Sequence, residues 1–292
     1  MKPIPESELV LQQDGSVYHL KLQPGQIAET ILIVGDPQRV AMISDKFDSV
    51  EHKSQNREIV THTGRVGQKR ITVMSTGMGT DNIDIVLTEL DALVNIDLKT
   101  RLPKEEFRSL NIIRLGTSGA LQDDIPINSV IMADYGLGLD GLVHYYGYKE
   151  SGIAEKIVDA FIRQSGFPEK LPRPYVVPGS DYLAEKFTPV AGFRGITVTA
   201  SGFYGPQGRS VRLPLAYPGL NDSIRNFRFG EMRVMNYEME TSALYGIGRL
   251  LNHNTLTLCL AIASRSNKKF HNDYHTAMDN MIQQVLAVVE TL

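Results

Sequence analysis

The chain has 292 residues, of which 42% are hydrophobic and 22% are charged, the composition of an ordinary globular protein. Its 30 basic and 33 acidic residues give a formal net charge of −3 without long runs of either sign, which argues against nucleic acid or a membrane surface as partner. Cys259 is the only cysteine, so an intramolecular disulfide and a multi-thiolate metal site are excluded, and its apolar neighbours at 255–263 predict a core residue. The sequence contains no run of about 18 apolar residues and no signal-peptide core, so we expect a cytoplasmic protein.

Short apolar runs alternate with segments of helical spacing, which predicts an α/β fold with a mixed central β-sheet flanked by helices. Asp36 and Pro37 suit the N-cap and first turn of a helix that follows the first strand. We expect one domain over residues 1–292, with a flexible N-terminal segment at 1–16. Strands are predicted at 30–34, 58–63, 69–75, 110–115, 129–133, 175–177, 195–201 and 255–263, and helices after Asp36, after Thr80, and at 153–164, 238–252 and 273–292, with a polar surface excursion at 95–109.

Three predicted strand ends are rich in glycine and hydroxyl groups: 35–39, 75–79 and 114–119. Backbone N–H groups, hydroxyls and guanidinium groups are the donors that phosphate needs. None of these segments matches a P-loop or a dinucleotide fingerprint, which argues against a nucleoside triphosphate or NAD. A Gly-Asp-Pro sequence alone is more often a simple turn, but Arg114 lies inside an apolar strand and needs a partner or a cleft.

Two further clusters carry polar and aromatic groups. In 236–240, Glu238 and Glu240 flank a methionine at the predicted start of a helix, where carboxylates either accept ribose hydroxyls or simply complement the helix dipole. In 203–209, an amide and a guanidinium lie two residues apart behind a phenylalanine, a set that suits a planar heterocycle. Considered alone, each cluster also fits an ordinary helix start or loop.

Taken in order, these segments resemble nucleoside phosphorylases of the uridine phosphorylase type. The resemblance runs through 18–20, 35–40, 75–79, 114–120, 203–209 and 234–240 to the C-terminal helix. It implies phosphorolysis of uridine, or of a related pyrimidine nucleoside, to uracil and ribose 1-phosphate. Inorganic phosphate is then a co-substrate, and no cofactor is expected.

The resemblance also implies roles for matching positions. The implied phosphate ligands are Gly35, Arg39, Arg114 and Thr117, with Arg57 lent by a neighbouring subunit. The implied ribose contacts are Glu238, Met239 and Glu240, with His19 reaching across the same interface to the 5′-hydroxyl. Gln207 and Arg209 are implied to read uracil beside Phe203, and catalysis is expected to depend on Arg39, Arg114, Gln207 and Arg209.

Shared sites imply a homo-oligomer built from dimers, and the family members are hexamers. Some of them bind a monovalent cation such as K⁺ at the dimer interface, and Glu58, Ile71 and Ser75 match those positions. Phosphate attacks the anomeric carbon while the protein positions it and stabilises the departing base, so no nucleophilic side chain is required.

Three alternatives remain open. Purine-cleaving relatives carry an aspartate after the strand near Ala263, but the segment 263–266 has no acid, which favours a pyrimidine. A nucleosidase uses water, and three candidate phosphate arginines argue against it. A non-catalytic nucleoside-binding protein on the same scaffold is expected to have a broken phosphate or ribose site.

Arg265 matches a family arginine near the base, although a structural salt bridge is an equal interpretation.

Overall fold

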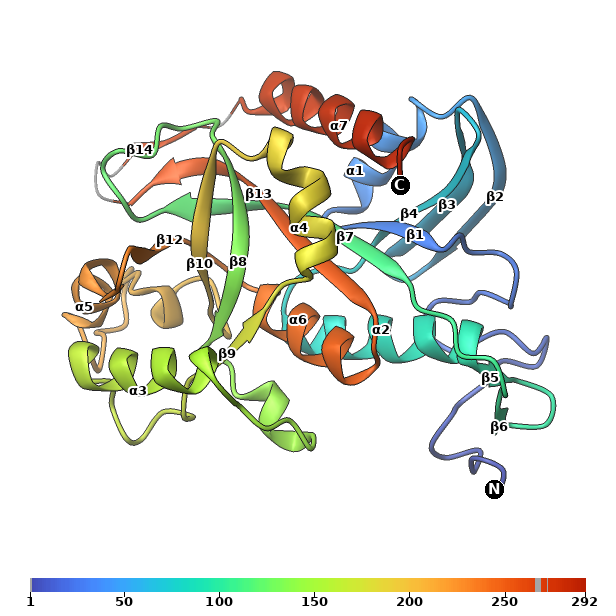
Figure 1. Ribbon diagram of the computed structural model, residues 1–292, viewed down its shortest axis with the longest axis horizontal. Helices are drawn as coiled ribbons and strands as arrows, with labels where there is room; N and C mark the ends of the chain where they lie inside the picture. The colour runs from blue at the N-terminus through green and yellow to red at the C-terminus, as the bar shows by residue number, and fades with distance from the viewer. Residues whose placement is uncertain (1, 266–268, 272) are drawn as a thin grey trace.

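A mixed β-sheet is the centre of the fold in the computed structural model, which describes residues 2–265, 269–271 and 273–292 (Figure 1). Twelve of the described strands form one sheet with the main path β11-β12-β10-β8-β13-β7-β1-β4-β3-β2, and β9 and β14 pair with β8 and β13. The strands are β1 (Thr30–Val34), β2 (Ser49–Asn56), β3 (Ile59–Val66), β4 (Lys69–Ser75), β5 (Ile96–Asp97), β6 (Leu102–Pro103), β7 (Asn111–Ala120), β8 (Val130–Gly138), β9 (Tyr175–Pro178), β10 (Phe193–Thr199), β11 (Arg228–Phe229), β12 (Met232–Glu238), β13 (Asn254–Ser264) and β14 (Lys269–Phe270).

Five strands close on themselves. Besides its parallel pairing with β10, β12 pairs antiparallel with β7 through Asn236↔Ala120 and Tyr237↔Gly119. The ring is completed by the pairs β10–β8, β8–β13 and β13–β7. This closure brings the end of β12 beside the end of β7, although the two strands are far apart in sequence.

Helices cover both faces of the sheet, because its central strands are apolar on both sides. In β1, Ile31 and Ile33 pack on the side of α2 and α6, whereas Leu32 and Val34 pack on the side of α1, α4 and α7. A third cluster packs α3 and α5 against β10 and β12. The helices are α1 (Pro37–Ser44), α2 (Thr80–Asn95), α3 (Ile153–Ser165), α4 (Asp181–Phe187), α5 (Leu220–Asn226), α6 (Thr241–Leu250) and α7 (His275–Val289), with short 3₁₀ turns at Leu142–Tyr145, Thr188–Val190 and Gly205–Gln207. None of the described helices has the length and apolar character needed to cross a membrane.

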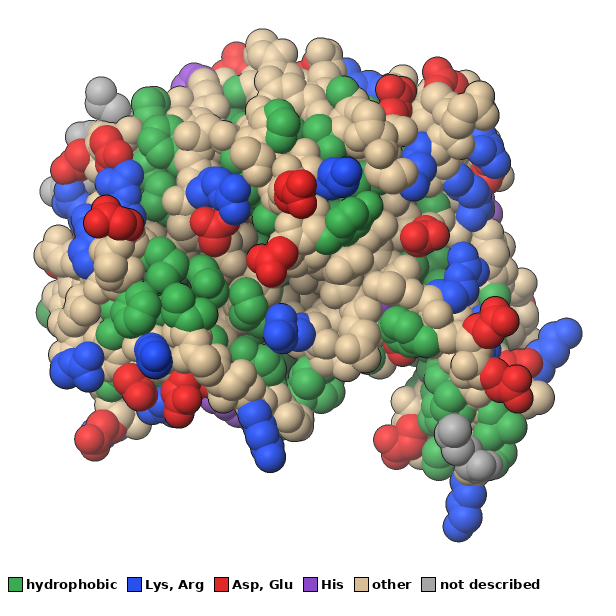
Figure 2. All heavy atoms as spheres, in the orientation of Figure 1, with side chains coloured by type: hydrophobic (Ala, Val, Ile, Leu, Met, Phe, Trp, Pro, Cys, Tyr) green, Lys and Arg blue, Asp and Glu red, His purple; other side chains and the backbone are tan. Residues whose placement is uncertain are grey.

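The N-terminal segment and the β5–β6 hairpin project together from the body at the lower right of Figure 2. The Ile4 amide donates to the Arg101 carbonyl at 2.9 Å, and the Arg101 guanidinium donates to the Leu9 carbonyl at 2.6 Å. Leu9 is 8% exposed in the cluster beside α2. Ile4 and Leu9 therefore have defined contacts within the segment 1–16, whose flexibility stays a prediction.

The predicted α/β fold is confirmed, and every predicted strand has a counterpart in the sheet. Asp36 accepts from the Gln38 amide at the start of α1, as its sequence predicted. The helix predicted at 238–252 is wrong at its start, since Glu238 ends β12 and α6 begins at Thr241. Strands β2 and β12 and helices α4 and α5 were not predicted from the sequence, and the excursion at 95–109 contains the β5–β6 hairpin. The single domain over 1–292 stays a prediction.

Candidate functional site

Two cavities of nearly equal volume, about 720 and 710 Å³, share Arg209 in their walls. The cavity of 710 Å³ is lined mainly by apolar residues of 204–221 and has no carboxylate among its described lining residues. The cavity of 720 Å³, called the site cavity, is lined by β7, by the ends of β1, β4 and β12 and by the loop after β10, and it contains buried arginines and carboxylates. A ligand with charged groups is therefore favoured in the site cavity.

One end of the site cavity, called the arginine end, is formed by Gly35, Arg39, Arg114 and Thr117. Arg39 is 6% exposed, and its Nη1 donates to the Leu115 carbonyl at 3.1 Å. Burial lowers the pKa of Arg39, while Tyr274 and Asp36 oppose this effect and Arg114 adds repulsion. Two guanidinium groups in a buried wall favour an anionic ligand.

Arg114 is held between two carboxylates. Its Nη1 lies 3.2 Å from Glu238 Oε2, its Nη2 is paired with Glu240, and its Nη1 also donates to Cys259 Sγ at 3.3 Å. Burial alone lowers the pKa of Arg114, but the two carboxylates outweigh burial and raise it. A Cβ atom at Gly116 would lie 2.1 Å from Nη1 of Arg114, so this position must be glycine for the guanidinium to keep its place.

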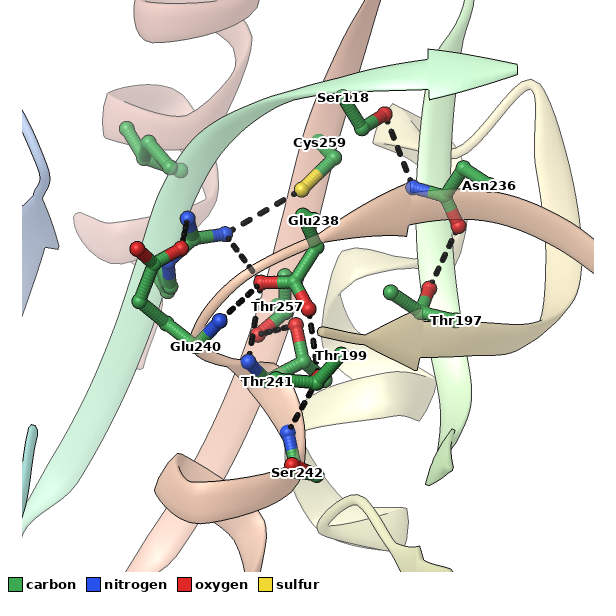
Figure 3. A network of polar contacts seen from close by, with 12 residues as sticks. Ser118, Thr197, Thr199, Asn236, Glu238, Glu240, Thr241, Ser242, Thr257 and Cys259 are labelled. Atoms are coloured by element: carbon green, nitrogen blue, oxygen red, sulfur yellow. Dashed lines mark hydrogen bonds and ion pairs between the residues drawn. The ribbon is translucent and has the colours of Figure 1, made fainter. Parts of the chain in front are cut away.

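Glu238 and Glu240 both line the cavity, but their surroundings differ (Figure 3). Glu238 is the last residue of β12, and its oxygens accept from Thr199 Oγ1 and from the amides of Glu240 and Thr241. Glu240 precedes α6 and accepts from the Gly79 amide at 2.7 Å. Burial is the largest effect on Glu240 and raises its pKa, Arg114 lowers it, and Glu238 raises it further. Met239 lies between them in the cavity wall.

The other end of the site cavity, called the loop end, is formed by Phe203, Gln207 and Arg209. The Arg209 guanidinium lies 3.8 Å from the centre of the Phe203 ring, and its Nη1 donates to Gln207 Oε1 at 2.7 Å. Arg265 Nη2 donates to the Gln207 carbonyl at 2.5 Å. Burial, followed by repulsion from Arg265, lowers the pKa of Arg209 to about 10. The loop end therefore penalises positive charge and favours a ligand that gains negative charge.

His19 and Arg57 are not among the residues that line the site cavity of their own chain. His19 Nδ1 lies 2.6 Å from Glu89 Oε1, and the side chain is 31% exposed. Arg57 is exposed, has a positive φ of 53°, and lies 5.9 Å from the centre of the Tyr18 ring. The resemblance assigns these two residues to the site of a neighbouring subunit, and that assignment stays a prediction.

Glu58, Ile71 and Ser75 do not form a cation cage within one chain. The Ser75 hydroxyl donates to the Glu58 carbonyl at 2.6 Å and accepts from the Val60 amide at 2.8 Å. Ile71 lies four residues earlier on β4, about 13 Å away at the usual rise per strand residue, and is paired on both sides by β1 and β3. Its side chain has no ligand atom. The cation stays a prediction for an assembled dimer.

Two residues that contribute to this arrangement were missed in the sequence. Tyr274 lines the arginine end and is hydrogen-bonded to Arg39, although 235 positions separate them. Thr199 ends β10 and holds Glu238. Neither residue carries a local signal, because both contacts depend on how distant strands and helices meet. Cys259 is fully buried, as its neighbours predicted, and burial raises the pKa of its thiol to about 12.

The chain is similar to known proteins in sequence and in structure. Residues 29–292 match the profile of the phosphorylase superfamily. The uridine phosphorylase of Thermococcus kodakarensis is 29% identical over 265 residues, covering 88% of this chain and 81% of that protein. The DeoD-type purine nucleoside phosphorylase of Shewanella denitrificans is 29% identical over 279 residues, covering 94% and 98%. Among solved structures, Trypanosoma brucei nucleoside phosphorylase, which shows uridine phosphorylase activity, has a TM-score of 0.89 at 27% identity and covers 97% of this chain and 100% of that chain.

Proposed function

We propose that this chain, which belongs to the phosphorylase superfamily, is a uridine phosphorylase that cleaves uridine or a related pyrimidine nucleoside with inorganic phosphate. The observation that carries the proposal is the set of groups that line one cavity: buried arginines, two carboxylates paired with one of them, and an amide with a guanidinium. These three kinds of group suit phosphate, ribose and base. The products are uracil and ribose 1-phosphate.

Phosphate binds at the arginine end, where Arg39 and Arg114 hold its charge and the backbone at Gly35 and Thr117 lies close by. One phosphate oxygen forms the new bond to the anomeric carbon as the bond from that carbon to the base nitrogen breaks. The bonding electron pair leaves with the base, and the sugar passes through an oxocarbenium-like state. Glu240 and Met239 hold the ribose, so the two reactants meet at a fixed distance.

Arg209 and Gln207, at the loop end, select the base. Because Arg209 donates to Gln207 Oε1, the amide nitrogen lies on the side of Gln207 away from the guanidinium. The pair therefore presents donor, acceptor and donor in sequence, which complements the carbonyl, N–H and carbonyl edge of uracil. The negative charge of departing uracil develops on its carbonyl oxygens, where Arg209 stabilises it. Hypoxanthine has no second carbonyl on this edge. The described residues 263–265 contain no acid that would protonate the ring nitrogen of a departing purine.

The assembly completes the site. We propose a homo-oligomer of dimers, such as a hexamer, in which a neighbouring subunit supplies Arg57 to the phosphate and His19 to the ribose 5′-hydroxyl. Arg57 is exposed and is not among the residues that line the cavity of its own chain, which supports this exchange. A K⁺ ion at the dimer interface and a cytoplasmic location belong to the same proposal.

The test compares uridine, inosine and cytidine as substrates of the purified protein at saturating phosphate, with base release followed by chromatography. The proposal expects uracil from uridine and far slower release from the other two. Faster release of hypoxanthine from inosine would overturn the assignment of the base, since relatives with purine nucleoside phosphorylase names match the chain as well.

A further inference from the structure

Thr199 is buried behind the wall of the site cavity and does not line it. Its hydroxyl donates to Glu238 Oε1 at 2.6 Å and accepts from the Ser242 amide at 2.9 Å (Figure 3). It thus joins the end of β10 to the end of β12 and to the first turn of α6. Both hydrogen bonds are direct.

The Glu238 carboxylate is held by four donors. Besides the Thr199 hydroxyl at Oε1, its Oε2 accepts from the amides of Glu240 and Thr241, each at 2.9 Å, and lies 3.2 Å from Arg114 Nη1. A carboxylate oxygen has about two acceptor positions, so Oε2, with three donors, has none left, and Oε1 keeps one beside the Thr199 hydroxyl. Its side chain is 1% exposed. Glu238 therefore acts as an anchor for Arg114, and the ribose hydroxyls are left to Glu240.

The same hydrogen-bond chain continues away from the cavity. Ser242 Oγ donates to Asp140 Oδ1 at 2.8 Å, and the Tyr175 hydroxyl donates to the same carboxylate at 2.9 Å. Asp140 belongs to the glycine- and tyrosine-rich segment 136–148, whose first residues, 136–138, end β8. Thr199 is thus the link between this segment and the Glu238–Arg114 pair.

We propose that Thr199 is a positioning residue: its hydroxyl fixes the Glu238 carboxylate, which in turn holds Arg114 in the orientation that binds phosphate. The inference rests on the proposed function for the identity of the anion at Arg114. Without the hydroxyl, Glu238 Oε1 and the Ser242 amide are both left without a partner in a buried place. The carboxylate then rotates, and Arg114 follows it.

Thr199→Val tests the proposal, because valine keeps the shape of threonine and removes only the hydroxyl. Thr197 provides a matched control: it lies two residues earlier on β10, is equally buried, and its hydroxyl donates to Asn236 Oδ1 at 2.7 Å without touching Glu238. Thr197→Val therefore removes a buried hydrogen bond from the same face of the same strand. Thr199→Ser restores the hydroxyl and serves as the rescue.

The first readout is the Kd for inorganic phosphate, measured by calorimetry on the full-length protein without nucleoside. Thr199→Val is expected to raise this Kd about tenfold, as removal of a hydrogen bond to a charged group does. Thr197→Val and Thr199→Ser are expected to stay within about twofold of the wild type. The midpoint of thermal unfolding should fall in both valine variants, and further in Thr199→Val, which loses two hydrogen bonds. The Kd is therefore measured at a temperature at which both variants are fully folded, so that lost stability does not explain the difference in Kd.

A Kd in Thr199→Val equal to that of Thr197→Val would overturn the proposal, and so would failure of Thr199→Ser to restore binding. If the valine variant does not fold, Thr199→Cys, whose thiol is a weak donor, must show the raised Kd instead. Failure of the proposed function gives a different pattern. A wild-type protein that binds phosphate but does not cleave uridine sinks the substrate assignment and leaves the test of Thr199 intact.

Discussion

Replacing Glu240 by glutamine removes one negative charge from the middle of the site cavity without changing the shape of the side chain. In the structure, Glu240 uses one acceptor position for the Gly79 amide and one for Arg114, which leaves about two of four for ribose hydroxyls. A hydrogen bond to a charged acceptor contributes about 1.5–3 kcal/mol, and a neutral one about 0.5–1.5 kcal/mol. The variant therefore loses about 1–2 kcal/mol per ribose hydroxyl, which is about 5- to 30-fold in kcat/KM.

The assay measures kcat/KM for uridine and for 2′-deoxyuridine in both proteins. The loss that the two substrates share reports the weakened pair between Glu240 and Arg114. The change in their ratio reports the contact to the 2′-hydroxyl, which only uridine has. We expect the preference for uridine to fall by about 5- to 30-fold. Equal losses for both substrates would refute the assignment of Glu240 to the ribose.

Four further predictions concern the two ends of the cavity and the buried thiol of Cys259. Arg39→Ala is expected to weaken phosphate-dependent catalysis by about 2–5 kcal/mol, since it removes a buried charged contact, and an unchanged phosphate KM would exclude this role. Tyr274→Phe should raise the phosphate KM by about 2- to 12-fold through the lost hydrogen bond to Arg39, while inhibition by uracil stays constant. Gln207→Ala should slow uridine cleavage far more than it weakens phosphate binding, and equal effects would contradict base reading. Burial raises the pKa of Cys259 from 9.0 to about 12, so its contribution to stability is complete below pH 9 and is lost as the pH rises towards 12; a thiol reagent at pH 8 should react only after denaturation.

The strand ends that carry glycine and arginine could be predicted because their signals are local. The apolar run of β1 and the Asp36–Pro37 helix start both depend on neighbours in sequence. Arg114 was conspicuous for the same reason, since a charge in an apolar strand demands a partner, and the structure supplies Glu238 and Glu240.

The parts of the fold and of the site that could not be predicted depend on contacts between residues far apart in sequence. Two carboxylates before an apolar helix look like a helix start, so Glu238 was assigned to α6 instead of β12. Strand β12 is defined by pairing with β10 and β7, whose residues lie far from it in sequence. The contact of Tyr274 with Arg39 has the same origin, because the packing of α7 beside β13 brings the two ends of the chain together.

The most direct test of the central claim is the release of uracil from uridine as the phosphate concentration is raised from zero, with the sugar product identified. The account predicts that release requires phosphate, saturates with it, and yields one ribose 1-phosphate per uracil. Uracil release at full rate without phosphate, with free ribose as the product, would contradict the account and would make water the nucleophile in this cavity.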